Sequence, residues 1–199
     1  MSWHLGIDTS NYTTSVAVWN SITNEMLQQK LKLPVKPGEL GLRQSDAVFA
    51  HTKQLGKLID SILRQVESLN SVGVSVRPRD IEGSYMPCFL VGKLAATAVA
   101  ATAKVPLYRF SHQAGHIGAV LFGSESGDLL EKDFIAFHFS GGTSESIYVT
   151  RGENIPFNTA GISSSSDLYA GQAIDRIGGM LGLSFPSGAE LEKLALKSD

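Results

Sequence analysis

The sequence has little that would direct it away from an ordinary globular fold. It holds a single cysteine, Cys88, so no disulfide can form within the chain and a reducing cytoplasm is the expected setting. Neither sign of charge dominates, because 17 basic residues face 19 acidic ones, and this excludes a global electrostatic attraction to nucleic acid. No apolar run reaches the roughly 18 residues that a membrane-spanning helix needs. The chain starts directly with a strand pattern, so neither a signal peptide nor a membrane partner is expected.

What is present is a regular alternation of short strands and helices. Hydrophobic residues make up 43% of the chain and charged residues 18%, as in typical globular domains. The pattern predicts an element order β-β-β-α-β-α-β-α. The expected strands are 3–7, 14–19, 25–32, 73–76 and 106–110, and the expected helices are 46–67, 87–104 and 112–122. Ser45 is the predicted cap of the first helix, whose apolar face includes Phe49, Leu55, Leu58 and Ile62.

This order predicts one particular fold class. Three consecutive strands fit an antiparallel meander, whereas strands separated by helices should pair in parallel through right-handed crossovers. The result is a ribonuclease-H-like α/β domain, a mixed sheet with flanking helices, over residues 1–123.

The strand–turn–strand pattern of the first domain begins again after a polar linker predicted at 124–132. "DFIAFHFSGGTSESIYVTR", from Asp133 to Arg151, reads as strand, glycine turn, strand, and two helices follow at about 167–181 and 188–197. We therefore expect residues 133–199 to be an incomplete second copy of the first domain. The chain is expected to be a fragment, or a naturally shortened member, of a two-domain protein.

The two strand–turn–strand segments are rich in groups that bind anions. The first, "LGIDTSNYTTSVAVWN", packs hydroxyls such as that of Ser10 into a bend between two buried strands. In the second, Gly141 and Gly142 would let the backbone approach a phosphate. Two such turns facing each other would hold a nucleotide between them. The alternative is a pair of hairpins with hydrophilic turns.

His112 and His116 lie four residues apart on a predicted helix. At this spacing both rings can face one ion, although two such histidines can also be ordinary surface or core residues. Cys88 has two readings as well. Its place at a helix start could lower the pKa of the thiol, but a small buried hydrophobic side chain is favoured.

Four stretches together resemble a known family: "LGIDTSNYTTSVAV", "SHQAGHIGAV", "FSGGTSESIYV" and "DLYAGQAIDRIGGMLGLSFPSGAELEKLA". They are similar to the glycoprotease family of actin-like ATPase-fold proteins, once called O-sialoglycoprotein endopeptidases. Its best-understood members are the tRNA threonylcarbamoyladenosine transferases. The stretches occur in the family's order and fill nearly all of the chain from Leu5 to Ala195, while family members are longer.

The resemblance implies a nucleotide-and-metal cleft. His112 and His116 match the family's metal ligands, for zinc or iron. The family's third protein ligand is a later aspartate, beyond residue 199, so weak metal binding is expected here. Asp8 keeps the first acid of the family's opening motif and is the candidate catalytic residue. The candidate nucleotide contacts, for ATP or a carbamoyl-adenylate, are Ser10, Ser140, Gly141, Gly142, Gly171, Asp175 and Gly188.

Two departures from the family pattern stand out. The transferases carry an opening pattern like E-T-S-C-D-E-T, and here Tyr12 and Thr13 stand where its later two acids would be. A turn without those carboxylates cannot use them to orient a cation or a nucleophile. The second departure is "SVRPRDIEGSYMP", residues 75–87, in place of a short glycine-rich turn. Its Arg77 and Arg79 would bind phosphate or a partner's carboxylate, or the loop is simply solvated, with local ion pairs.

Three functions remain open at this stage. The first is a transferase-type enzyme, which would also need tRNA as a partner. The second is a non-catalytic paralogue that binds nucleotide or a partner protein, as a homodimer or as a heterodimer with a relative of the same fold. The third, a metalloendopeptidase, is disfavoured because Gln113 follows His112 where zinc proteases of the His-Glu-x-x-His kind carry their general base.

Overall fold

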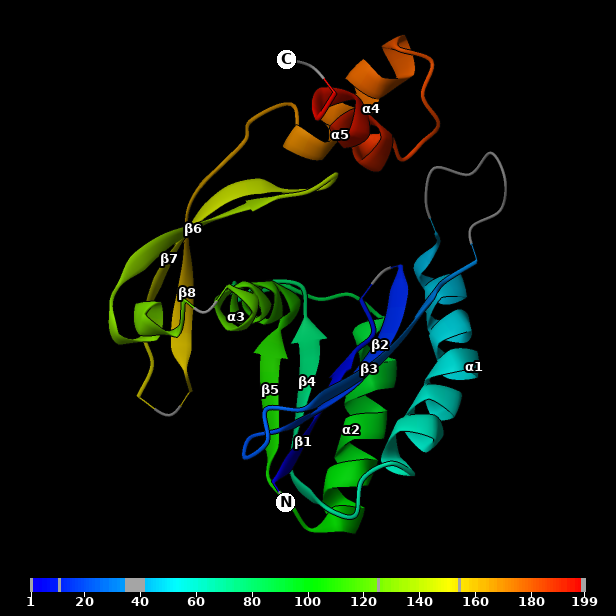
Figure 1. The fold of residues 1–199 in the computed structure, drawn as a ribbon, viewed down its shortest axis with the longest axis vertical. Coiled ribbons are helices and arrows are strands. Elements are labelled where there is room, and N and C mark those ends of the chain that lie inside the picture. Colours follow the sequence, from blue (N-terminus) through cyan, green and yellow to red (C-terminus); the bar gives the residue numbers. More distant parts are fainter. Residues whose placement is uncertain (1, 11, 35–41, 125, 154, 198–199) are drawn as a thin grey trace. The chain divides into compact units, whose positions relative to one another are not determined.

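The computed structural model describes residues 2–10, 12–34, 42–124, 126–153 and 155–197. The chain forms two compact units that divide between Ala119 and Val120, and each is described here by itself (Figure 1). The predicted linker at 124–132 contains a short 3-10 helix, η1 (Gly127–Glu131). The domain boundaries at 123 and 133 stay predictions.

The first unit is built on a five-stranded mixed sheet (Figure 1). Its strand order is β3-β2-β1-β4-β5. The first three strands form an antiparallel meander, and β4 and β5 add in parallel, as the element order predicts. The strands are β1 (Trp3–Asp8), β2 (Thr13–Asn20), β3 (Met26–Lys32), β4 (Leu69–Arg77) and β5 (Leu107–Ser111), and the helices are α1 (Gln44–Leu63), α2 (Phe89–Ala103) and α3 (His112–Gly123).

The core of this unit lies between the sheet and two helices on one of its faces. Trp3, Leu5 and Ile7 of β1 are buried against apolar residues of α1 and α2. The helix α2 contributes the small side chains Ala96 and Ala100 to this core. Because successive side chains of a strand point to opposite faces, Asp8 follows Ile7 onto the face away from α1 and α2. This alternation frees the carboxylate at the end of β1 for the site.

The first helix corrects two expectations. It begins at Gln44, with Arg43 in the cap position and no capping side-chain bond, so Ser45 lies inside the first turn and is not the cap. Phe49 is 66% exposed and does not belong to the apolar face. Residues on the adjacent side of the helix, including His51, are buried instead. Most of the loop before this helix, residues 35–41, lies outside the described residues.

The second unit contains a three-stranded antiparallel sheet, in the order β6-β7-β8, and two helices. The elements are β6 (Phe134–Phe139), β7 (Ser144–Arg151), β8 (Phe157–Ser164), α4 (Ala170–Met180) and α5 (Gly188–Ala195). The strand β8 was not predicted, because it has no regular apolar alternation and is exposed over most of its length. Its pairing with β7 defines it. In the described parts of both units, no helix is long and apolar enough to span a membrane.

Candidate active site in the first unit and glycine turn in the second

The turn after β1 is anchored on both sides of the sheet. Asp8 Oδ1 accepts a hydrogen bond from the backbone N–H of Ser10 at 2.8 Å, a local bond that favours a tight turn. Thr9 faces the helix α2, where its hydroxyl donates to the carbonyl of Cys88 at 2.9 Å and accepts from the N–H of Gly92 at 3.1 Å. A Cβ at position 92 would lie 2.8 Å from that hydroxyl oxygen. The absence of a side chain at Gly92 therefore lets α2 hold the turn in place.

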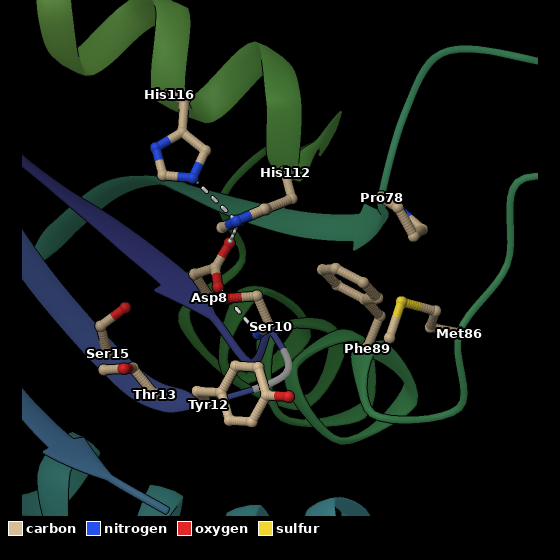
Figure 2. A pocket seen from close by; sticks show the side chains of 10 residues that line it. All are labelled: Asp8, Ser10, Tyr12, Thr13, Ser15, Pro78, Met86, Phe89, His112 and His116. Carbon is tan, nitrogen blue, oxygen red and sulfur yellow. Dashed lines mark hydrogen bonds and ion pairs between the residues drawn. The ribbon is translucent and has the colours of Figure 1, made fainter. Parts of the chain in front are cut away.

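The predicted histidine pair lies beside Asp8 (Figure 2). His112 is the first residue of α3, directly after β5. Its Nδ1 lies 2.8 Å from Asp8 Oδ2, and its Nε2 lies 2.9 Å from the Nε2 of His116. Because β1 and β5 both flank β4 in parallel, the ends of the two strands meet at the same edge of the sheet. The sheet topology thus brings Asp8 to the histidine pair, two candidates that the sequence analysis chose separately.

The charge of Asp8 sets the direction of these hydrogen bonds. Burial alone would raise the pKa of Asp8, but the hydrogen bond and charge of His112, with bonds from Ser75 and Ser10, hold that pKa well below its usual range. The ionised carboxylate can only accept, so the Nδ1 of His112 carries the proton. In a neutral ring the Nε2 of His112 then presents its lone pair, and the Nε2–H of His116 donates to it. The hydrogen-bond network assigns these tautomers.

The donor set fits a divalent metal that prefers imidazole ligands. Two histidine nitrogens on a tetrahedral zinc ion lie about 3.3 Å apart, so the two Nε2 atoms would need to separate by only a few tenths of an ångström. Asp8 orients His112 through its other nitrogen, an arrangement common around metal-bound histidines. Within the described ranges, however, no group of three or more His, Cys, Asp or Glu side chains could hold a metal. The assignment of His112 and His116 as weak metal ligands stays a prediction.

These residues line a cavity of about 390 Å³. Its lining residues are Asp8, Ser10, Tyr12, Thr13, Ser15, Pro78, Met86, Phe89, His112 and His116 (Figure 2). Cys88 is fully buried, and burial raises the pKa of its thiol to about 11. The favoured reading of Cys88 as a buried hydrophobic side chain is confirmed, and the reading of a lowered thiol pKa at a helix start is wrong.

A third histidine, His51, lies close to the turn and was missed by the sequence analysis. His51 of α1 is fully buried, with its Nδ1 2.8 Å from the hydroxyl of Thr14. That hydroxyl donates to Gln54 Oε1 at 2.8 Å, and Gln54 Nε2 donates to the carbonyl of Lys32 at 3.2 Å. The single hydroxyl proton of Thr14 is used on Gln54, so His51 Nδ1–H donates to Thr14. The signal was available, since His51 lies four residues before the buried Leu55 on the same helical face.

His51 makes the stability of the first unit depend on pH. Burial lowers the pKa of His51 below its ordinary 6.5, although the backbone of Ser10 and the charge of Asp8 partly oppose this. The unfolded chain therefore binds the proton more tightly than the folded one, and stability is full above about pH 6.5 and falls as the pH is lowered through that value. Urea unfolding between pH 7.5 and pH 5 should show this decrease in the free energy of unfolding.

The matched variants are His51→Gln and His4→Gln. The decrease should become shallower in His51→Gln and should persist in His4→Gln, because His4 lies outside the α1 packing. An unchanged slope in His51→Gln would contradict the assignment.

The glycine turn of the second unit is closed by hydrogen bonds among its own residues. The N–H of Ser140 donates to the carbonyl of Thr143 at 2.7 Å, and the N–H of Gly142 donates to the hydroxyl of Ser140 at 3.2 Å. In the described part of the chain, no atom lies within 4 Å of a Cβ built at Gly141 or Gly142. Internal packing therefore does not explain these two glycines, and the space beside them is open.

The start of α4 lies directly on this turn. The N–H of Gly171 donates to the carbonyl of Ser140 at 3.0 Å, and that of Ala170 donates to the hydroxyl of Ser144 at 2.8 Å. A Cβ at position 171 would lie 2.5 Å from the backbone nitrogen of Gly141. The contact thus requires glycine at 171, and it joins the predicted helix-start motif to the predicted phosphate turn.

The other two candidate nucleotide contacts lie where α4 meets α5. Asp175 follows Gly171 by one helical turn, and its Oδ1 accepts from the N–H of Ser187 at 2.8 Å. Gly188 begins α5, and a Cβ there would make only ordinary contact with Ile174. Asp175 therefore has a structural partner within the unit. The roles of Asp175, Gly188 and the other nucleotide-contact candidates stay predictions, since the two units hold separate parts of the set.

Comparison with known proteins identifies relatives over nearly the whole chain. The family described as "TsaD: tRNA N6-adenosine threonylcarbamoyltransferase" matches residues 24–199. The tRNA N6-adenosine threonylcarbamoyltransferase of Enterococcus faecalis is 31% identical over 198 residues, covering 96% of this chain and 53% of the relative. That of Ligilactobacillus salivarius is 30% identical over 197 residues, with the same two coverages. The chain spans about half the length of the curated relatives it matches.

A solved structure confirms the predicted fold class. YeaZ from Pseudomonas aeruginosa aligns with a TM-score of 0.51 and 14% identity, covering 83% of this chain and 67% of YeaZ. This likeness concerns the fold alone, which is the ribonuclease-H-like plan of actin-like ATPases. Together with the family match, it agrees with the glycoprotease-family resemblance of the motifs. The chain belongs to the tRNA N6-adenosine threonylcarbamoyltransferase family.

Proposed function

We propose that this chain binds a nucleotide together with a divalent metal ion, zinc or iron. The proposal rests above all on the 2.9 Å approach of the Nε2 atoms of His112 and His116, with Asp8 holding the first ring. His112 and His116 would hold the ion, which when bound would polarise an acyl or phosphoryl oxygen. Asp8 fixes the tautomer of His112, and the Ser10 hydroxyl lines the same cavity.

The second unit would supply the nucleotide-binding turn. The open space at Gly141 and Gly142 supports a phosphate beside the turn, where backbone N–H groups can meet an anion. In this proposal ATP or a carbamoyl-adenylate is the ligand. An active protein would carry out acyl transfer to tRNA, as the names of its relatives suggest, and the cytoplasm is its proposed location.

One observation favours a second candidate, a non-catalytic paralogue. Tyr12 and Thr13 line the cavity next to Asp8, where the resemblance predicts two acids. A chain without these carboxylates would keep ligand binding and lose transfer, serving as a scaffold for a second copy or for a relative of the same fold. Proteolysis is not favoured, because the amide side chain of Gln113 is buried and cannot take a proton.

Isothermal titration of the whole protein with ATP tests the proposal, in the absence and presence of zinc or iron. We expect metal-dependent binding that is lost in the His112→Ala/His116→Ala variant and kept in His4→Ala. A result in which neither ATP nor metal binds the unmodified protein would overturn it. Binding without transfer of a threonylcarbamoyl group to tRNA would favour the scaffold.

A further inference from the structure

The two departures from the family pattern meet in one place. Tyr12, from the opening turn, lines the same cavity as Pro78 and Met86, from the segment that replaces the glycine-rich loop. Figure 2 shows Pro78, Met86 and Phe89 gathered on one side of the cavity, with the ring of Tyr12 below Asp8. Substitutions that are distant in the sequence thus change the same surface.

The loop is fixed to the helix that carries the histidine pair. The carbonyl of Pro78 accepts from the N–H of Gln113 at 3.0 Å. Asp80 Oδ2 accepts from the hydroxyl of Ser111 at 2.7 Å, and that hydroxyl accepts from the N–H of Ala114 at 3.0 Å. Arg77 donates to the other oxygen of Asp80 at 2.8 Å. The predicted local ion pair is therefore present, and the same carboxylate attaches the loop to the start of α3.

The cavity consequently has two chemically different sides. Asp8, Ser10 and the histidine pair provide charge, hydroxyl and imidazole groups. Tyr12 is 47% exposed, Phe89 is buried behind the surface, and Pro78 and Met86 are half-buried. The aromatic rings, the thioether and the proline of this lining offer stacking and sulfur–aromatic contacts to a planar apolar group.

We propose that this cavity selects a ligand that joins a planar aromatic group to an anionic, metal-binding head. The head lies at His112 and His116, and the ring packs against Tyr12 and Met86. The loop from Arg77 to Met86 is the specificity element, and Asp80 is its positioning residue. The placement of the head rests on the metal site of the proposed function. The placement of the ring rests only on the apolar side of the cavity, formed by Tyr12, Pro78, Met86 and Phe89.

Two small hydroxamates test this in the zinc-loaded protein, because they share a metal-binding head and differ in the attached group. Isothermal titration should give benzohydroxamate about a tenfold higher affinity than acetohydroxamate, through burial of the ring. The affinity ratio should fall towards one in the Tyr12→Ser/Met86→Ala variant. It should be kept in Tyr85→Ser, a matched control in which an exposed tyrosine of the same loop, outside the cavity lining, is removed.

The ratio of the benzohydroxamate affinity to the acetohydroxamate affinity also tests the role of Asp80 in positioning the loop. Asp80→Ala should lower the ratio, and Asp80→Asn should restore much of it because an amide oxygen can still accept from Ser111. If zinc binds but the ratio is near one in the unmodified protein, or is unchanged in the double variant, the aromatic selectivity is overturned and the metal site survives. A protein that binds no zinc overturns the proposed function and, with it, this inference.

Discussion

Replacing Asp8 by asparagine is expected to lower the affinity for zinc by about ten- to a hundred-fold, the usual cost of removing an outer partner of a metal-bound histidine. The carboxylate now accepts from both the Ser10 N–H and His112 Nδ1. In the variant, the amide oxygen can keep the bond to Ser10 while its NH₂ group faces His112. The favoured tautomer of His112 then carries its proton on Nε2, and that proton occupies the position that the metal requires.

Zinc titration against a competing chelator at pH 7.5 measures this effect. The Asp128→Asn variant is the control, since that exposed carboxylate pairs with the exposed Lys132 on the surface of the second unit. Histidine side-chain NMR provides a readout that does not depend on the metal, because the Nδ1–H signal of His112 should give way to an Nε2–H signal. Unchanged zinc affinity, with the His112 proton still on Nδ1, would contradict the orienting role of Asp8.

Replacing Gly171 by alanine is expected to destabilise the second unit by about 1–3 kcal/mol, the range for overpacking a tight contact. The new methyl group would lie 2.5 Å from the backbone nitrogen of Gly141 and 2.6 Å from the carbonyl carbon of Ser140. Backbone atoms cannot rotate away as a side chain can. The helix α4 must therefore move off the turn, which weakens the bonds at Ser140 and Ser144 and lowers ATP affinity.

Gly179→Ala is the matched control in the same helix. A Cβ there meets no atom within 4 Å among the described residues, and alanine is favoured over glycine in a helix interior by up to about 1 kcal/mol. Urea unfolding should therefore move in opposite directions for the two variants. If Gly171→Ala is as stable as Gly179→Ala and binds ATP equally well, the turn does not depend on this close contact.

Local patterns predicted most of the first unit, because each element carries its own periodicity. The meander and the parallel strands follow from the element order, and the apolar face of α1 was found through Leu55, Leu58 and Ile62. The strand β8 was not predicted because it depends on hydrogen bonds to β7 more than on its own side chains. The prediction of Ser45 as the helix cap was wrong because the helix starts earlier, without any side-chain cap.

The residues of the candidate site were predicted as separate motifs, but the contacts between them were not. The sequence supplied Asp8 and the spacing of the two histidines, but the hydrogen bond between Asp8 and His112 depends on strand pairing across the sheet. The support from His51 and the attachment of Asp80 to Ser111 are tertiary in the same way. No local spacing encodes such contacts, because their partners come from different elements.

The bond between Asp8 and His112 joins residues 104 positions apart, and this has a consequence for folding. The β1–β2–β3 meander can form from neighbouring segments, but β5 is joined to β1 only through β4, which lies between them. Closing so long a loop costs entropy that the later packing must offset. The histidine pair can form with its own helix, since its members lie four residues apart, but its contact with Asp8 is expected to form late in folding. A metal ion that binds only the finished arrangement would stabilise the native state in proportion to the logarithm of its concentration, so that zinc dependence of refolding yield would report directly on completion of the sheet.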